Sequence, residues 1–392
     1  MKIGIVLSST PGYSETFFTS KISGLQAQGF EVVLFTQVKR SDFNVCPVIK
    51  SPKIYKNPVK QVILMIFVFM SLMPHLKSIL KYIKLEKTKG VGTFKLLKKV
   101  YLNSHILSKK VDWLHFGFAT QAIDNEHLAK AIGAKMAISF RGFDINVYPI
   151  KYPGCYNLVW SNVDKVHTIS EDLIDKAYCL GLSKKIDFKV IPPAIDYSNF
   201  KTIKTKVSSN TLQIVTVARL NWIKGLDFAI DAMQILKNKG LEFEYHIVGS
   251  GTPTEIERYA FQIHQLGLEK QVFLYGKQSH SDTMLKLNSA DIYLQPSIQE
   301  GFCNSVLEAQ ARGIMTLVSD VGGLKENVIH EVTGWRIPER DVNSIVNGIL
   351  QIVNVSTDTK NKVSENAIAR VKSSFNLKDQ QKQFVSFYLN EK

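Results

Sequence analysis

Short apolar runs alternate with amphipathic segments along most of the 392 residues. The apolar runs are rich in Val, Ile, Leu and Phe, which is typical of strands that are buried on both faces. In the first half, these runs predict strands at 2–7, 31–36, 111–117, 135–140 and 166–170. Because strands and helices alternate, the pattern predicts an α/β fold built on parallel sheets.

The pattern is interrupted once and then restarts. Residues 196–210 are polar and include Ser208, Ser209 and Asn210, which predicts a linker. The strands expected after it are 212–218, 244–248, 272–277 and 290–295.

A chain of this length exceeds the usual limit of a single core. We therefore expect one domain at 1–200 and a second at 201–375. The closing segment, 376–392, is expected to form a helix that packs back on the first domain.

Residues 296–313 carry the most informative chemistry. The strand at 290–295 ends, a tight loop holds Glu300, and a helix follows that Gly313 ends. Asn304 or Ser305 is the expected N-cap of this helix, and Glu308 lies about one turn into it. Helical side chains lean towards the N-terminus, so both carboxylates are expected to approach one space in front of the helix.

This combination suits a sugar joined to a phosphate. Carboxylates accept hydrogen bonds from vicinal sugar hydroxyls, and a helix N-terminus suits a phosphate. A second pair of charges, Arg219 and Lys224, follows the strand at 212–218 and suits a diphosphate. The alternatives are surface glutamates on an ordinary strand–loop–helix and two solvent-facing cations.

The motif Glu-Gly-Phe…Leu-Glu-Ala, with Glu300 and Glu308, resembles the donor-site signature of the retaining glycosyltransferases of family 4. The resemblance implies a GT-B fold, in which two Rossmann-like α/β domains face each other across a cleft. It also implies that Arg219 and Lys224 neutralise the departing diphosphate, while Glu308 holds the ribose and Glu300 the donor sugar. The remaining donor-side residues that it implies are Gly301, Phe302, Cys303, Asn304, Ser305, Gly249, Gly276 and Lys277.

The resemblance is specific in the second half and looser in the first. Cys303 stands where the family commonly has glycine. In the first half, the resemblance points to Ser14, Glu15 and Asp144 as acceptor-side residues and to His115 and Arg141 as residues that take part in catalysis. Arg141 replaces a histidine that the family often has. An ordinary turn at Ser14–Glu15 and a structural role for His115 remain alternatives.

The net charge of +15 is carried by the first half. Residues 50–110 contain 14 lysines, no arginine and one acidic residue, Glu86. They also contain an apolar run at 62–73, which is too short to span a bilayer, and an amphipathic segment at 76–84. Arginine is the expected residue for recognition of bases, so we expect contact with an anionic membrane surface and not with nucleic acid. The alternative is a core helix beside a solvated lysine face.

Together these features predict an enzyme that moves a sugar from a nucleotide-sugar to a saccharide or lipid-linked saccharide in cell-surface polysaccharide synthesis. No cofactor is expected, and no metal, because the titratable residues lack metal-ligand spacing. The four scattered cysteines and the short first apolar run predict a cytoplasmic protein, peripheral on the inner face of the cell membrane.

Three alternatives remain open. They are a nucleotide-sugar epimerase of the same fold, an NAD-dependent dehydrogenase and an inactive carbohydrate- or membrane-binding scaffold. The dehydrogenase is disfavoured because the glycine loop at Gly249 has Thr254 where the dinucleotide fingerprint requires glycine.

Overall fold

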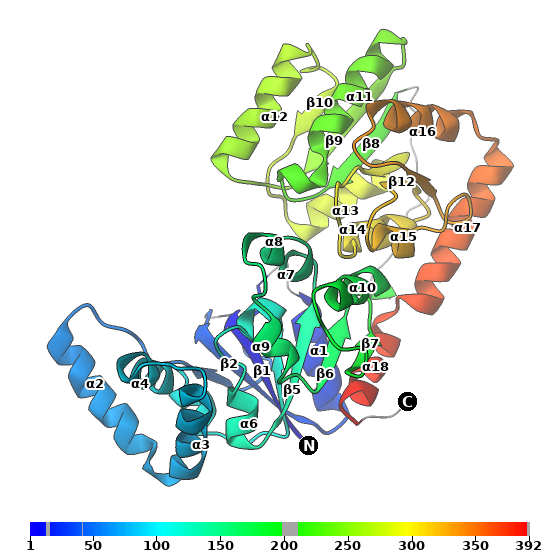
Figure 1. Cartoon of the computed structure of the whole chain (residues 1–392). Coiled ribbons are helices and arrows are strands. Elements are labelled where there is room, and N and C mark those ends of the chain that lie inside the picture. Colours follow the sequence, from blue (N-terminus) through cyan, green and yellow to red (C-terminus); the bar gives the residue numbers. More distant parts are fainter. Residues whose placement is uncertain (13–15, 41, 198–210, 390–392) are drawn as a thin grey trace. The chain divides into compact units, whose positions relative to one another are not determined.

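The computed structural model describes residues 1–12, 16–40, 42–197 and 211–389. The chain divides into two units (Figure 1). The first unit comprises Met1–Ile191 together with Gln381–Lys392, and the second comprises Pro192–Gln380. The first unit thus ends a few residues before the expected boundary at 200 and includes the end of the chain. Most of the expected linker lies outside the described residues.

The first unit contains a seven-stranded parallel sheet with the strand order β3-β2-β1-β4-β5-β6-β7. Its strands are β1 (Lys2–Ser9), β2 (Glu31–Val38), β3 (Val48–Lys50), β4 (Trp113–Phe116), β5 (Lys135–Phe140), β6 (Lys165–Thr168) and β7 (Asp187–Val190). All residues of β4 and β6 are buried, which explains the continuous apolar runs in the sequence.

The helices of the first unit connect these strands. They are α1 (Thr16–Ala27), α2 (Pro58–Ser71), the 3-10 turn η2 (Met73–His75), α3 (Leu76–Lys87), α4 (Thr93–Leu102), α5 (Ser104–Leu107), the 3-10 turn η3 (Ala119–Gln121), α6 (Leu128–Ile132), α7 (Phe143–Asn146), α8 (Tyr148–Lys151), α9 (Asn157–Trp160) and α10 (Glu171–Cys179). Helix α2 begins with Pro58 at its first position, and the Asn57 side chain accepts a hydrogen bond from the Lys60 amide at 3.1 Å.

The second unit contains a six-stranded parallel sheet with the order β10-β9-β8-β11-β12-β13. Its strands are β8 (Leu212–Val217), β9 (Phe243–Val248), β10 (Val272–Leu274), β11 (Ile292–Gln295), β12 (Met315–Ser319) and β13 (Trp335–Ile337). Its helices are the 3-10 turn η5 (Trp222–Lys224), α11 (Leu226–Asn238), α12 (Pro253–Gln265), α13 (His280–Ser289), α14 (Asn304–Gln310), α15 (Leu324–Asn327), α16 (Val342–Asn354) and α17 (Thr357–Ser374).

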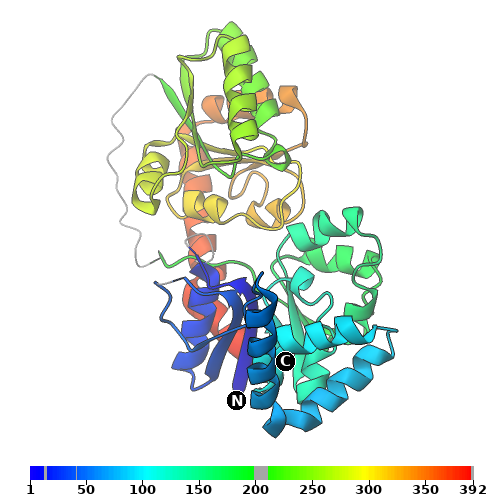
Figure 2. The same cartoon turned by 90° about the vertical axis from the view of Figure 1, so that its left-hand side faces the viewer.

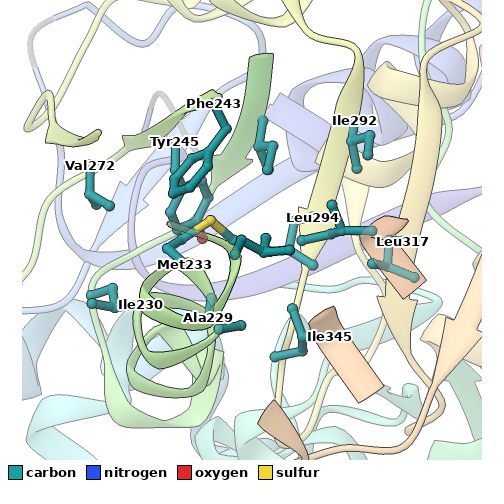
Figure 3. Close-up of a cluster of buried hydrophobic side chains, with 14 of the residues drawn as sticks. Ala229, Ile230, Met233, Phe243, Tyr245, Val272, Ile292, Leu294, Leu317 and Ile345 are labelled. Atoms are coloured by element: carbon teal, nitrogen blue, oxygen red, sulfur yellow. The ribbon is translucent and has the colours of Figure 1, made fainter. Parts of the chain in front are cut away.

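The core of the second unit lies between its sheet and helices that include α11 and α16. Figure 3 shows Met233 of α11 beside Phe243 and Tyr245 of β9, with Leu294 of β11 and Leu317 of β12 in the same cluster. These side chains are almost completely buried, and burial of such large apolar side chains contributes roughly 1.5–3 kcal/mol each.

Each sheet has a point at which the order of its strands reverses. The chain builds outward from β1 to β3 and returns to β4, and it builds outward from β8 to β10 and returns to β11. In open parallel sheets, ligands bind outside the carboxyl ends of the strands at such a point. The topology therefore directs attention to the loops after β1 and β4 and to those after β8 and β11.

The last helix, α18 (Leu377–Leu389), contributes to the core of the first unit. Phe384, Phe387 and Tyr388 are buried together with residues of β1, β2 and β4. The Lys189 side chain of β7 donates a hydrogen bond to Ser386. Helix α18 is thus part of the first domain, although it is far in sequence from the other elements of that domain.

Candidate active site

The candidate donor site lies at the carboxyl ends of β8 and β11. Arg219 follows β8, and Lys224 closes the turn η5 that leads into α11. Glu300 lies in the loop after β11, and Glu308 lies in α14. The parallel topology therefore brings these four predicted residues to the same edge of the second sheet.

Backbone contacts tie the loop after β8 to the loop after β11. The Ile298 amide donates a hydrogen bond to the Ile223 carbonyl at 2.9 Å. Gly225 has a φ of 62°, and a Cβ atom there would lie 2.1 Å from the Pro296 carbonyl oxygen. Glycine is required because it permits both the left-handed backbone and this close approach. The two loops are thereby held against each other.

The two loops also share an ion pair. Lys224 donates a hydrogen bond from Nζ to Glu300 Oε2, and each side chain is only 14% exposed. Burial lowers the pKa of Lys224, but attraction to Glu300, the neighbouring Cys303 and the hydrogen bond to Glu300 together outweigh burial, so that the pKa of Lys224 is raised. The positive charge of Arg219 acts in the opposite direction. Lys224 is therefore charged, and two cations lie near one carboxylate.

A chain of buried hydrogen bonds that starts in β11 orients the Glu300 carboxylate. The Tyr293 hydroxyl donates to Gln295 Oε1 at 2.7 Å, and Gln295 Nε2 donates to Ser297 Oγ at 2.8 Å. Ser297 Oγ then donates to Glu300 Oε2 at 3.4 Å. Gln295 and Ser297 are fully buried, and polar groups in such places are retained where their hydrogen bonds are satisfied. This chain therefore limits the positions that the Glu300 carboxylate can take.

The segment after β12 holds the same loop from the other side. The Gly323 amide donates a hydrogen bond to the Glu300 carbonyl at 3.0 Å. A Cβ atom on Gly322 would lie 2.1 Å from that carbonyl oxygen, and one on Gly323 would lie 1.9 Å from the Gly301 carbonyl oxygen. The two consecutive glycines thus let the backbones approach closely and fix the course of the Glu300 loop.

Asn327 fixes the residue at which α14 begins. The Cys303 amide donates to Asn327 Oδ1 at 2.9 Å, and Asn327 Nδ2 donates to the Cys303 carbonyl at 3.2 Å. Arg370 of α17 donates in turn to the carbonyls of Asn327 at 2.7 Å and Glu326 at 2.5 Å. Asn327 is completely buried, so this clamp is part of the interior that supports the site.

The N-cap of α14 is Cys303, and the expectation of Asn304 or Ser305 is wrong. The Cys303 backbone is extended, with φ −117° and ψ 110°, and the helix begins at Asn304. Burial and the nearby Glu300 raise the pKa of the Cys303 thiol to about 11. The thiol is therefore protonated at neutral pH. It packs as a small buried group where the family commonly has glycine.

Glu308 lies half-buried on α14. Burial raises the pKa of Glu308 to about 7, and the positive charge of Arg312 opposes this rise. Arg312 is itself held by hydrogen bonds from Nη1 to the Glu308 carbonyl and from Nε to Asn288 Oδ1, both at 2.8 Å. A carboxylate in this environment gains from hydroxyl groups that donate to it, because they stabilise its charged form.

The other predicted donor residues differ in exposure. Gly301 is buried, as is Phe302, whose ring centre lies 5.5 Å from that of Phe375, so the Phe302 ring supports the loop from inside. Asn304 is exposed and Ser305 is half-buried.

The loop after β9 meets the loop after β10. The Gly249 amide donates to the Gly276 carbonyl at 2.9 Å. Gly249 has a φ of 140°, and a Cβ atom there would lie 1.9 Å from the Ala218 carbonyl oxygen. Lys277, next to Gly276, is exposed. The ends of β8, β9 and β10 are therefore packed backbone to backbone along this edge.

On the first domain, Arg141 and Asp144 lie after the carboxyl end of β5. The Arg141 guanidinium carbon lies 3.6 Å from the centre of the Phe17 ring, and Nε donates to the Gly117 carbonyl at 3.4 Å. Buried Asp144 accepts hydrogen bonds from the amides of Arg141 and Gly142, both at 2.9 Å. Burial raises the pKa of Asp144, and these amides oppose the rise. Asp144 therefore fixes the loop that carries Arg141.

The loop after β1 is described only in part, and Ser14 and Glu15 lie outside the described residues. Near Gly12, the Arg40 side chain lies so close that a Cβ atom on Gly12 would be 1.7 Å from its Nη1 atom. The Arg40 amide donates to Thr10 Oγ1 at 2.9 Å. The described start of this loop is therefore packed against the loop after β2.

His115 is completely buried beneath α18, which argues against the expected contact with a substrate. Its Nε2 atom lies 2.7 Å from Ser139 Oγ, and its Nδ1 atom lies 2.6 Å from the Tyr388 hydroxyl and 3.1 Å from Lys21 Nζ. Burial lowers the pKa of His115, so the ring is neutral. The geometry supports the alternative, a structural histidine that joins β4, β5 and α18.

Comparison with known proteins identifies the family. The family described as "Glycosyl transferases group 1" matches residues 199–370. The amylovoran biosynthesis glycosyltransferase AmsK of Erwinia amylovora is 30% identical over 298 residues, which cover 73% of this chain and 72% of AmsK. The chain belongs to the group 1 glycosyltransferases. A second relative of this glycosyltransferase is the putative colanic acid biosynthesis glycosyltransferase WcaL of Escherichia coli K12, 29% identical over 270 residues. The match covers 67% of this chain and 66% of WcaL.

Solved structures show the same fold. HepE of Anabaena, solved in complex with UDP and glucose, has a TM-score of 0.74 over 100% of both chains, at 16% sequence identity. WaaG, a glycosyltransferase involved in lipopolysaccharide biosynthesis, has a TM-score of 0.70 at 14% identity, over 99% of this chain and 100% of WaaG. The fold of this glycosyltransferase is GT-B, as the sequence predicts.

Within the described ranges of the enzyme, no group of three or more His, Cys, Asp or Glu side chains could hold a metal ion. The predicted charged groups that follow β8 and β11 are Arg219, Lys224, Glu300 and Glu308.

Several residues that shape the site were not anticipated from the sequence. Gln295 is the one with a visible signal, because it is a polar residue at the end of an otherwise apolar strand. Asn327, Arg370 and Tyr388 gave none. Their roles depend on segments that come together only in the folded chain.

Proposed function

We propose that this enzyme is a retaining glycosyltransferase that uses a nucleotide-sugar donor. The observation that carries the proposal is the Lys224–Glu300 ion pair, which joins the loops after β8 and β11 with Arg219 nearby. Cleavage of the bond between sugar and phosphate places negative charge on the departing diphosphate. Fixed cations aimed at developing charge are usually the largest single contribution to catalysis.

Each charged group has a proposed role. Arg219 and Lys224 bind the diphosphate, Glu300 accepts hydrogen bonds from the donor sugar, and Glu308 accepts them from the ribose. The Lys224–Glu300 contact supports these roles, because a donor with adjacent sugar and phosphate groups needs a cation beside a carboxylate. The departing phosphate takes the proton of the acceptor hydroxyl, and the sugar keeps its anomeric configuration. We propose that no metal takes part, since the two cations supply the positive charge.

The proposed acceptor is a saccharide or lipid-linked saccharide in cell-surface polysaccharide synthesis. The support comes from relatives named for amylovoran and colanic acid biosynthesis. A further relative, from Escherichia coli, is named as a galactosyltransferase that acts on GlcNAc-diphosphoundecaprenol; it is 28% identical over 55% of this chain. Arg141 and Asp144, at the carboxyl edge of the first sheet, are the proposed acceptor-side residues, with Asp144 acting through the loop that it fixes.

We place the enzyme in the cytoplasm, peripheral on the inner face of the cell membrane. The support is the lysine excess of residues 50–110, which favours an anionic surface. No single described helix is long and apolar enough to cross a membrane.

Product analysis tests the proposed reaction. Purified enzyme is incubated with UDP-, GDP- and ADP-sugars and with a short saccharide linked through a diphosphate to a lipid, and the product is examined by mass spectrometry and NMR. The proposal predicts an acceptor that is one sugar longer, with the anomeric configuration of the donor. A changed nucleotide-sugar without transfer indicates an epimerase, and an inverted linkage contradicts the retaining mechanism.

A further inference from the structure

Helix α2 exposes an apolar surface without burying any of its own residues. Val59, Val62, Ile63, Ile66, Phe67 and Met70 are all largely exposed. These residues follow the spacing of one helical face. The opposite side chains, including Leu64 and Val68, are only half-buried. A surface of this kind marks an interaction site.

The apolar surface continues onto the neighbouring segments. Met73 in η2 and Leu76 and Leu80 in α3 are more than half exposed, and Phe94 in α4 is 84% exposed. Figures 1 and 2 show α2, α3 and α4 together at one side of the first domain. The surface is thus shared by three helices.

Lysines surround this apolar surface. Lys77, Lys81 and Lys84 of α3 and Lys95 and Lys98 of α4 are exposed. Glu86, the sole acidic residue between 50 and 110, is completely buried. The exposed charge of these helices is therefore positive throughout, and the partner must offer negative charge beside an apolar interior. A second copy of this chain fits poorly, because a two-fold contact through this face brings two lysine-rich surfaces of like charge together.

Buried ion pairs fix α3 to the body of the domain. Lys99 Nζ donates to Glu86 Oε2 at 2.5 Å, and the His127 ring nitrogen Nδ1 lies 3.1 Å from Glu86 Oε1. Lys89 Nζ donates to Glu126 Oε2 at 2.8 Å. Separating a buried ion pair leaves an uncompensated charge, which is strongly unfavourable. These contacts therefore hold α3 in place. This bears on a possible broken span, because among the described helices one bent pair, Pro58–Ser71 with Met73–Lys87, passes the test of length and composition. Its second half is anchored within the protein.

We propose that α2 lies in the plane of an anionic membrane with its apolar side chains inserted below the head groups. Phe94 makes a second apolar contact, and the lysines of α3 and α4 lie over the phosphates. Amphipathic helices with a basic flank and an apolar face bind bilayers in this way. The inference rests on the proposed function for its purpose, the presentation of a lipid-linked acceptor. It adds a second contribution to the electrostatic attraction between the lysines and the membrane. This contribution is the insertion of apolar side chains, which salt does not screen.

Vesicle sedimentation of the full chain tests the insertion without any transfer reaction. The vesicles are phosphatidylcholine alone or with phosphatidylglycerol, at 0.1 M and 1 M salt. Ile63→Ser with Phe67→Ser removes the centre of the apolar face, and Phe261→Ser, on an equally exposed phenylalanine of α12, is the matched control. A triple variant of α3 carries Lys77→Gln, Lys81→Gln and Lys84→Gln. Its control is a triple variant at three exposed lysines elsewhere, with Lys239→Gln, Lys270→Gln and Lys362→Gln.

We expect the unchanged protein to bind anionic vesicles and to remain partly bound at 1 M salt. The α2 variant should bind at least ten-fold more weakly at both salt concentrations, and the α3 lysine variant more weakly mainly at 0.1 M salt. Both controls should bind like the unchanged protein. As a direct readout, lipids brominated on their acyl chains should quench the tryptophan fluorescence of Phe67→Trp more than that of the unchanged protein, which contains only the native tryptophans.

Three results overturn the inference. They are complete release by salt, binding of the α2 variant like the unchanged protein, and a change of oligomeric state on Ile63→Ser with Phe67→Ser while vesicle binding persists. Binding to vesicles by a protein that transfers no sugar leaves the inserted helix standing and removes the proposed reaction instead.

Discussion

Lys224 Nζ and Glu300 Oε2 are joined by a hydrogen bond that links the loop after β8 to the loop after β11. The two residues are far apart in sequence, but their strands are neighbours at the point where the second sheet reverses. The contact holds together the cation proposed to bind the diphosphate and the carboxylate proposed to bind the donor sugar. Pre-positioning of this kind saves reorganisation during the reaction.

The first prediction concerns this pair. Lys224→Ala is expected to lower turnover by about 100-fold, or about 3 kcal/mol, because a fixed cation on the leaving group is lost. Glu300→Ala should lower turnover more than donor affinity, since Glu300 is proposed to hold the reacting sugar. The double variant should lose less than the product of the two single effects, because the residues contact each other. Steady-state kinetics of the four proteins measures this, with Lys239→Ala as a control on an exposed lysine. Wild-type turnover in either single variant contradicts the assignment.

The second prediction concerns the pH dependence of Glu308, whose pKa is raised by burial to about 7. Donor affinity should increase as the pH rises through about 7, because the ionised carboxylate accepts hydrogen bonds from the ribose. Stability should change in the opposite sense. A carboxyl whose folded pKa is raised contributes stability below its unfolded pKa, and this contribution is lost as the pH rises through the folded value.

Glu308→Gln separates the two effects. The variant should bind donor weakly at every pH and unfold at a higher temperature than the unchanged protein at pH 8, but not at pH 4. Thermal unfolding at both pH values measures this, and Glu365→Gln, at an exposed glutamate of α17, is the control. If the unfolding temperatures of Glu308→Gln and the unchanged protein differ by the same amount at pH 4 and at pH 8, the result argues against the raised pKa.

The third prediction concerns the Asn327 clamp on Cys303. Asn327→Ala leaves the Cys303 amide and carbonyl without these buried partners, which costs about 1–3 kcal/mol of unfolding free energy for each unsatisfied group. Turnover should fall as well, because the clamp supports the loop of Glu300. Asn343→Ala, at an asparagine outside the site near the start of α16, is the comparison in thermal unfolding and kinetics. Equal stability and turnover in the two variants argue against a clamp.

The fourth prediction is that activity survives EDTA. Arg219, Lys224 and backbone N–H groups are proposed to meet the charge of the diphosphate, so no divalent ion is needed. Transfer is measured with and without EDTA and after addition of Mg²⁺ or Mn²⁺. Complete loss that either ion restores contradicts the metal-free proposal.

The sequence predicted the parallel sheets and the donor-edge residues because both depend on local patterns. Apolar runs locate β4 and β11, and strand ends followed by charged loops locate Lys224 and Glu300. The partners of Cys303 could not be predicted, since Asn327 belongs to α15, a separate segment that meets Cys303 only in the folded chain. The choice between a functional and a structural role for His115 could not be made from the sequence for a similar reason. Tyr388, a partner of His115, lies 273 residues further along the chain, and a motif carries no information on that contact.

Helix α2 shows a different limit. An apolar run such as 62–73 looks the same in sequence whether it packs in a core or faces outward. The prediction for α3 was only partly right, because Ile79 and Tyr82 are buried while Leu76 and Leu80 are exposed. The lysines on the same helices were the available clue, and they indicated a surface without showing how much apolar area it contains.

Donor binding measured by titration calorimetry tests the central claim most directly. UDP-, GDP- and ADP-sugars are titrated into the unchanged protein, Glu308→Ala, Arg219→Ala and the control Lys239→Ala. The account predicts that at least one nucleotide-sugar binds the unchanged protein and the control equally, and that both site variants bind it at least ten-fold more weakly. Tight binding that is the same in all four proteins, or no binding of any nucleotide-sugar, contradicts a donor site at the ends of β8 and β11.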